Sequence, residues 1–186
     1  MMTPLTLIKE TGVGLDDANS YADVDDGNAY HAGHLYATAW TAATDEQKAV
    51  ALVMSTRLID AEFQFNGTRT NAVQGLQWPR ARCPEPDAIH VPLQVLLPIP
   101  SDFVPFDSVP KAVVDATCEV ARALLVEDRT ANPLGEGLKF TGLGASQTSF
   151  DKADRRPVIP YVAQAMLMKY GSLILTKSGS VRLTRA

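Results

Sequence analysis

The sequence has 186 residues, 46% of them hydrophobic and 20% charged, with a formal net charge of −4. This length and composition suffice for the core of one globular domain. No apolar run approaches the roughly 20 residues of a membrane-spanning helix, and the start, Met1 to Leu5, lacks the features of a signal peptide. We therefore expect a protein made in a cytoplasm, without a membrane partner. Cys83 and Cys118 are too few for a disulfide framework, so we expect both to be buried and reduced.

The charge is distributed unevenly along the chain. The part from Arg155 onward contains six basic residues and no acidic one: Arg155, Arg156, Lys169, Lys177, Arg182 and Arg185. The part before it holds the other 11 basic residues and all 21 acidic residues, a net charge of −10. An acidic body with a basic end predicts that this end meets something negative, either nucleic acid or the body of a neighbouring copy.

Four segments carry helical signals. Asp23 can cap a helix that runs to about Leu35, in which Gly27 costs about 1 kcal/mol relative to alanine. Thr44 to Gln47 forms a capping box in front of apolar residues at helical spacing, which predicts a helix to about Phe63. Ser108 or Val109 opens a third helix, with Pro110 in its first turn, that fades near Asp128, and a short fourth helix follows Pro160.

Long connections separate these helices. Residues 68–109 contain seven prolines, which exclude a long helix or a central strand, although part of this segment is strongly apolar. Residues 130–157 are rich in glycine and predict a mobile loop. The sequence thus predicts a mainly α fold, a small bundle of about four helices with long extended loops. Its helical domain covers residues 1–169, and residues 170–186 form a C-terminal arm or hairpin.

The C-terminal arm is the candidate interface with another protein. It alternates apolar and polar residues as an extended strand does, and a hairpin this short is marginal alone. Its apolar members are Leu173, Leu175 and Val181, and its basic members are Lys177, Arg182 and Arg185. We expect it to bind by strand addition, with the basic residues selecting the partner.

Motifs that would support catalysis or metal binding are incomplete. Asp23 to Gly27 fails the EF-hand spacing, and His31 with His34 lacks a recognisable third and fourth ligand, so we expect both histidines at the surface. The glycine-rich segment 135–144 lacks the strand and Gly-Lys-Ser/Thr of a phosphate-binding loop. We therefore expect no enzymatic activity, no cofactor and no metal.

Residues Trp78 to Arg82 allow two interpretations. A tryptophan beside two arginines can stack on bases of single-stranded nucleic acid. Alternatively, Trp78 anchors the core, Pro79 sets a turn and Arg80 pairs with a carboxylate. The acidic surroundings favour the second interpretation.

Several short motifs occur in a recognisable order. They are Glu10-Thr-Gly-Val-Gly14, Ala18-Asn-Ser-Tyr21, the stretch Ser55 to Asp60 with Arg57 and Asp60, Phe65-Asn-Gly67, Gln74-Gly-Leu-Gln-Trp-Pro-Arg80 and Val109-Pro110. This set, spread over about residues 8–126, resembles the head-completion or head-tail connector (adaptor) proteins of tailed phages, a group also described as DnaT-like and single-stranded-DNA-binding.

The resemblance implies a structural protein of the virion, located at the head-tail interface. It implies that about twelve copies form a homo-oligomeric ring under the portal protein. This ring would also contact a tail or second connector protein. Genomic DNA would pass through the ring without sequence-specific binding. The alternative function is that of a single-stranded-DNA-binding replication accessory protein. The connection before Val109 is longer than the group's usual pattern, so contacts of residues 83–109 are not carried over.

Overall fold

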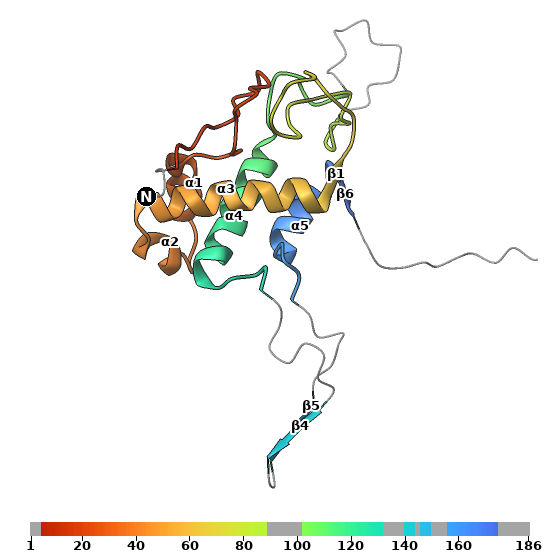
Figure 1. The fold of residues 1–186 in the computed structure, drawn as a ribbon. Coiled ribbons are helices and arrows are strands. Elements are labelled where there is room, and N and C mark those ends of the chain that lie inside the picture. Colours follow the sequence, from red (N-terminus) through yellow and green to blue (C-terminus); the bar gives the residue numbers. More distant parts are fainter. Residues whose placement is uncertain (1–4, 89–101, 132–139, 144–145, 150–155, 175–186) are drawn as a thin grey trace, which may run out of the picture.

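A computed structural model describes residues 5–88, 102–131, 140–143, 146–149 and 156–174. The longest helix, α3 (Asp45–Glu62), lies across the molecule in Figure 1. The Thr44 hydroxyl accepts from the Gln47 amide at 3.3 Å, and the Gln47 side chain accepts from the Thr44 amide at 3.0 Å. This capping box satisfies two amides that the helix leaves unpaired, and it confirms the helix start predicted from the sequence.

Helix α4 (Lys111–Val126) crosses α3 and is the centre of the packing. It contacts α3, α1 (Val24–Ala32), α2 (Thr38–Ala42) and α5 (Tyr161–Leu167). Pro110 stands at the N-cap of α4, as its lack of an amide hydrogen allows. The first helix ends at Ala32 rather than near Leu35, and α2 was not expected, because five residues are too few to show a helical period.

Six short strands pair in three antiparallel two-stranded sheets among the described residues. Strand β1 (Phe63–Phe65) pairs with β6 (Gly171–Leu173), β2 (Thr68–Arg69) with β3 (Arg80–Ala81), and β4 (Phe140–Leu143) with β5 (Ser146–Ser149). The fold is therefore mixed α/β, and the predicted mainly α class was wrong. Strands of two to four residues are too short to show an alternation, and the β1–β6 pair joins distant segments.

Strand β6 also bears on the predicted arm. Residues 171–173 pair with β1, and the Ile174 amide donates to the Glu62 carbonyl at 2.7 Å. The start of the segment 170–186 is thus part of the folded body. Residues 175–186 lie outside the described ranges, as do 89–101 of the proline-rich segment and most of the loop 130–157.

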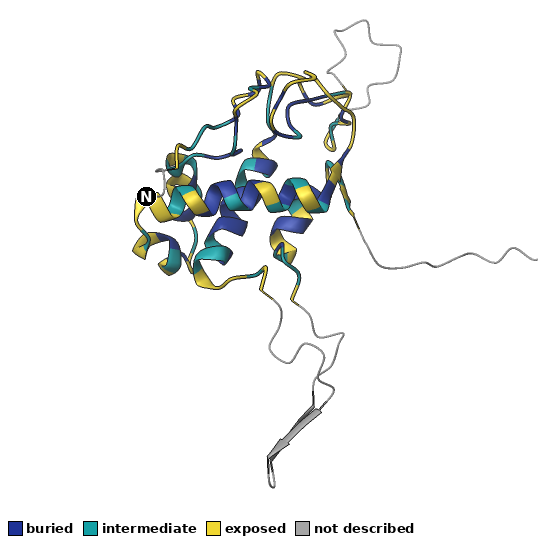
Figure 2. Ribbon diagram, in the orientation of Figure 1, coloured by how far each residue is buried: buried dark blue, intermediate teal, exposed yellow. Residues whose placement is uncertain are grey.

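Two hydrophobic clusters form the core on either side of the α3–α4 contact, where the buried residues of Figure 2 gather. The helix-covered cluster lies between α1, α2, α3 and α4, and consists of Ala22, Trp40, Ala51, Leu52, Cys118 and Ala121. The loop-covered cluster is larger and includes Tyr21, Ile59, Phe63, Phe65, Trp78, Cys83, Val113, Ile159 and Leu167. Both cysteines are buried and free, and none of the helices described is long and apolar enough to cross a bilayer.

Candidate nucleic-acid interface

The Trp78 ring, the candidate for base stacking, is completely buried. Its centroid lies 5.6 Å from that of Phe65 and 6.0 Å from that of Tyr170, both edge to face. The Trp78–Pro79 peptide bond is cis. A base would need an open ring face, so this tryptophan serves packing in the folded protein.

Arg80 is also buried, with 5% of its surface exposed. Its guanidinium donates to the carbonyl oxygens of Asn66 at 2.7 Å, Gly67 at 2.7 Å and Gln77 at 3.1 Å. Burial lowers the pKa of Arg80 from its ordinary value. The partners are thus carbonyl groups and not the expected carboxylate. These bonds hold the turn between β1 and β2 against β3, so this side chain is not positioned to bind a phosphate.

Asp60 ties the end of α3 to the loop before Trp78. One of its carboxylate oxygens accepts a hydrogen bond from the Tyr21 hydroxyl at 2.5 Å, and the other accepts one from the Gln77 amide at 3.0 Å. Burial raises the pKa of Asp60 to about 6. Arg57, expected in the same motif, is exposed on α3 and makes no hydrogen bond or ion pair within the described residues.

Glu10 occupies a site that sequence reasoning missed. Its buried carboxylate accepts backbone amides from Gly12 at 2.8 Å, Gly14 at 3.0 Å and Leu15 at 2.9 Å. Both glycines have positive φ, 104° and 75°, which folds the chain around the carboxylate. Such a ring of amides binds anions, and here the anion is the protein's own. The Glu-x-Gly-x-Gly spacing was the available signal.

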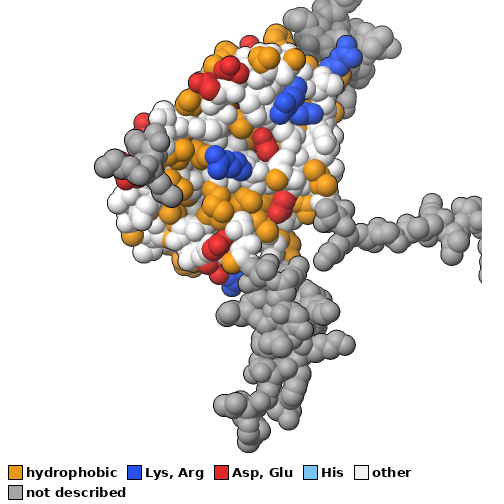
Figure 3. Space-filling model, in the orientation of Figure 1, with side chains coloured by type: hydrophobic (Ala, Val, Ile, Leu, Met, Phe, Trp, Pro, Cys, Tyr) orange, Lys and Arg blue, Asp and Glu red, His pale blue; other side chains and the backbone are white. Residues whose placement is uncertain are grey.

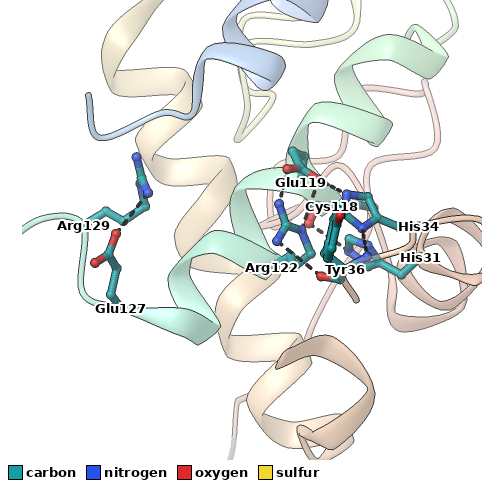
Figure 4. A network of polar contacts seen from close by, with 8 residues as sticks. All are labelled: His31, His34, Tyr36, Cys118, Glu119, Arg122, Glu127 and Arg129. Carbon is teal, nitrogen blue, oxygen red and sulfur yellow. Dashed lines mark hydrogen bonds and ion pairs between the residues drawn. The ribbon is translucent and has the colours of Figure 1, made fainter. Parts of the chain in front are cut away.

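The two histidines lie between α1 and α4 in the network of Figure 4. His31 is buried, contrary to the expected surface position, and its Nε2 lies 3.1 Å from the Cys118 carbonyl. Burial lowers the pKa of His31. His34 lies 3.8 Å from the Glu119 carboxylate, which also binds Arg122. Among the residues described, no three His, Cys, Asp or Glu side chains are grouped to hold a metal ion.

Acidic side chains outnumber basic ones on the folded body. Arg57, Arg69, Arg82 and Lys169 are exposed and form no ion pair within the described residues, whereas Lys111 and Arg156 are exposed but pair with Asp115 and Glu127. The described residues hold 11 basic and 18 acidic side chains, a net charge of −7. The other six basic residues, Lys177, Arg182 and Arg185 among them, lie outside these ranges together with Leu175 and Val181. Leu173 is the one arm residue of the predicted interface that is described, and it packs partly buried against the loop-covered cluster.

A family model described as "Putative DnaT-like ssDNA binding protein" matches residues 5–186, nearly the whole chain. The chain belongs to this family. No curated protein matches, and no solved structure matches either.

Membership of the DnaT-like family supports one part of the resemblance seen in the sequence, the DnaT-like label, but not the head-tail connector. The motif residues with described contacts, Glu10, Tyr21, Asp60, Trp78 and Arg80, hold the scaffold together. These residues are therefore structural in the folded protein.

Proposed function

We propose that this DnaT-like protein binds single-stranded DNA without catalysing a reaction, and that the basic residues from Arg155 onward make the contacts. The family match along residues 5–186 carries the proposal, since the family is described by this activity. Phosphate contacts from Lys and Arg supply most of the affinity for nucleic acid without sequence preference. The end of this chain holds six such residues and no acidic one.

The folded body is the less suitable surface for DNA. Its described residues carry a net charge of −7, which repels phosphate. Trp78 and Arg80 are buried, and the amides that could bind a phosphate around Gly12 are occupied by Glu10. These facts favour the basic end of the chain as the surface that binds DNA.

The experiment measures fluorescence anisotropy of a labelled oligothymidine strand at several salt concentrations. In the tail variant, Lys177, Arg182 and Arg185 are all replaced by Ser. In a matched body variant, Arg57, Arg69 and Arg82, which are exposed and lie before Arg155, are replaced by Ser. We expect the tail variant alone to bind more weakly, with the slope of log affinity against log salt shallower by about 2, which three lost phosphate contacts predict.

Two results would overturn the proposal. If the unchanged protein does not bind the oligonucleotide at physiological salt, single-strand binding is not its function. If the body variant loses affinity and the tail variant keeps it, the DNA lies on the folded body.

A second candidate function is the structural one, a head-tail connector of a tailed phage. The observation that favours it is apolar surface in the described part of the chain, with Leu35 85%, Tyr36 74% and Tyr161 73% exposed. Contiguous apolar surface is typical of protein interfaces, and Leu35 and Tyr36 are neighbours in the chain. In this proposal a ring of about twelve copies sits between the portal and a tail protein in the virion.

Co-expression with a portal protein separates the two candidates. Negative-stain images of rings bound to the portal, together with no shift of an oligonucleotide, support the connector. An oligonucleotide shift without any association with the portal supports single-strand binding.

A further inference from the structure

An apolar groove of about 390 Å³ lies between the first half of α3 and the end of α4. Val50, Ala51 and Met54 form its α3 wall and Leu124 and Leu125 its α4 wall, with Glu46 at one end. Val50 is 52% exposed. Figure 3 shows apolar side chains gathered over α3 and over the region just below it, where α4 crosses.

The groove continues as a stripe along α3 towards its C-terminal end. Val50, Met54, Leu58 and Ala61 recur at spacings of three and four residues, so they share one side of the helix. Each is at least partly accessible. Glu62, one turn beyond Leu58, lies on the same side, and its carbonyl accepts the amide of Ile174. The chain after β6 therefore departs from the far end of this stripe.

The remaining chain is long enough to reach the groove. From Glu62 back to Val50 the helix rises by about 18 Å. The twelve residues 175–186 span up to about 40 Å when extended. When extended, about half of this segment is long enough to span the roughly 18 Å along α3, so the residues from Val181 onward can reach the groove.

Charge and pattern favour this segment as the occupant. Residues 175–186 contain Lys177, Arg182 and Arg185 and no acidic residue. Glu46 and Glu62, at the two ends of the stripe, form no ion pair within the ranges described. In Val181-Arg-Leu183 two apolar side chains flank a basic one, so an extended chain can direct the apolar pair into the groove and Arg182 to the solvent.

We propose that the α3–α4 groove binds the chain's own C-terminal segment, with Val181 and Leu183 in the groove and Lys177 and Arg185 against the acidic ends of the stripe. This surface goes beyond DNA binding and does not rest on it. Where both hold, docking and DNA compete for the same basic residues.

Disulfide trapping tests the proposal on the full-length chain. The groove pair replaces Met54 and Leu183 with Cys, and the control pair replaces Val73, which is 66% exposed, and Leu183 with Cys. Cys83 and Cys118 are buried and do not interfere. Under mild oxidation we expect the groove pair to form a disulfide within one chain at least about tenfold faster than the control pair, the factor that burial of one aliphatic side chain gives. Equal rates, or covalent dimers in place of an internal disulfide, would refute it.

A second variant avoids the added cysteines. Val50→Arg places a cation in the groove, and exposure of Val50 means that the body still folds. We expect trypsin to cleave after Lys177 and Arg182 about tenfold faster than in the unchanged protein, because the loss of one buried aliphatic side chain shifts the docked segment to the free state. Val73→Arg is the matched control and should leave the rate unchanged. An unchanged rate in Val50→Arg contradicts the proposal.

Discussion

The two tryptophans are both buried, but helices surround Trp40 whereas loops surround Trp78. Trp40 lies in the helix-covered cluster, 1% exposed, and its ring packs on the bare backbone of Gly27 in α1. Its indole nitrogen donates to the Asn28 side chain at 3.0 Å. Trp78 lies in the loop-covered cluster, 0% exposed, and its indole nitrogen has no partner among the described residues.

The difference between the two sites lies in what builds the wall around each ring. Helices satisfy their own backbone groups, so Trp40 needs only close packing. Loops do not, so the wall near Trp78 depends on side chains that bind backbone: Glu10, Asp60, Gln74, Gln77 and Arg80. A loop-built wall thus requires polar side chains at specific positions, and several of them belong to the short motifs singled out in the sequence.

Replacing Trp78 with Ala is expected to have the largest effect on stability. The change empties the centre of the loop-covered cluster and should lower the free energy of unfolding by about 3–5 kcal/mol. Urea denaturation measures it, and oligonucleotide binding is recorded at a temperature where the variant is still folded. A variant with full stability and no DNA binding would show instead that Trp78 stacks on bases.

The same contrast explains what the sequence could predict. The capping box at Thr44 and the apolar period behind it identify α3, because helices depend on neighbouring residues. The pairing of Phe63–Phe65 with Gly171–Leu173 depends on residues far apart in the chain, so no local pattern indicates it. Trp78 was correctly favoured as a core residue, but the carbonyl partners of Arg80 follow from the path of a loop, which periodicity does not describe. His31 was expected at the surface because nothing local shows that α4 covers it.

Glu10 tests whether the loop wall depends on a single carboxylate. Glu10→Ala leaves three backbone amides without an acceptor and should cost about 3 kcal/mol. Glu10→Gln keeps the shape and should cost less. Asp17→Ala, an exposed acidic residue of the same segment, is the control and should change little. Equal stability of Glu10→Ala and Asp17→Ala would mean that water replaces the carboxylate.

Gly27 tests the helix-built wall. Helix propensity alone predicts that Gly27→Ala stabilises α1 by about 1 kcal/mol. The structure predicts the opposite, because a Cβ at this position would lie 2.3 Å from the Trp40 ring. We expect a loss of about 1–3 kcal/mol from overpacking. Gly33→Ala, with nothing within 4 Å of the added carbon, is the matched control and should be neutral or mildly stabilising. A stabilised Gly27→Ala would show that the tryptophan moves aside without cost.

The smallest expected effect is a pH dependence carried by Asp60. Burial raises the pKa of this carboxyl from its ordinary value of 3.8 to about 6, although the bonds from Tyr21 and Gln77 oppose the shift. The folded state therefore holds the proton more tightly than the unfolded state. The resulting stability is fully present below pH 3.8 and is lost as the pH rises through about 6. Between pH 7 and pH 5 the gain on acidification is about 1 kcal/mol.

His31 acts in the opposite direction, because burial lowers its pKa and acidification must then charge a buried ring. The contribution of Asp60 is therefore isolated as the difference between the unchanged protein and Asp60→Asn. The free energy of unfolding of both proteins is measured with urea at pH 5, 6 and 7. Between pH 7 and pH 5 the unchanged protein should gain about 1 kcal/mol in this free energy relative to Asp60→Asn. Parallel stability profiles would mean that Asp60 ionises as in water. The loop-built wall would then admit solvent where the helix-built wall around Trp40 does not.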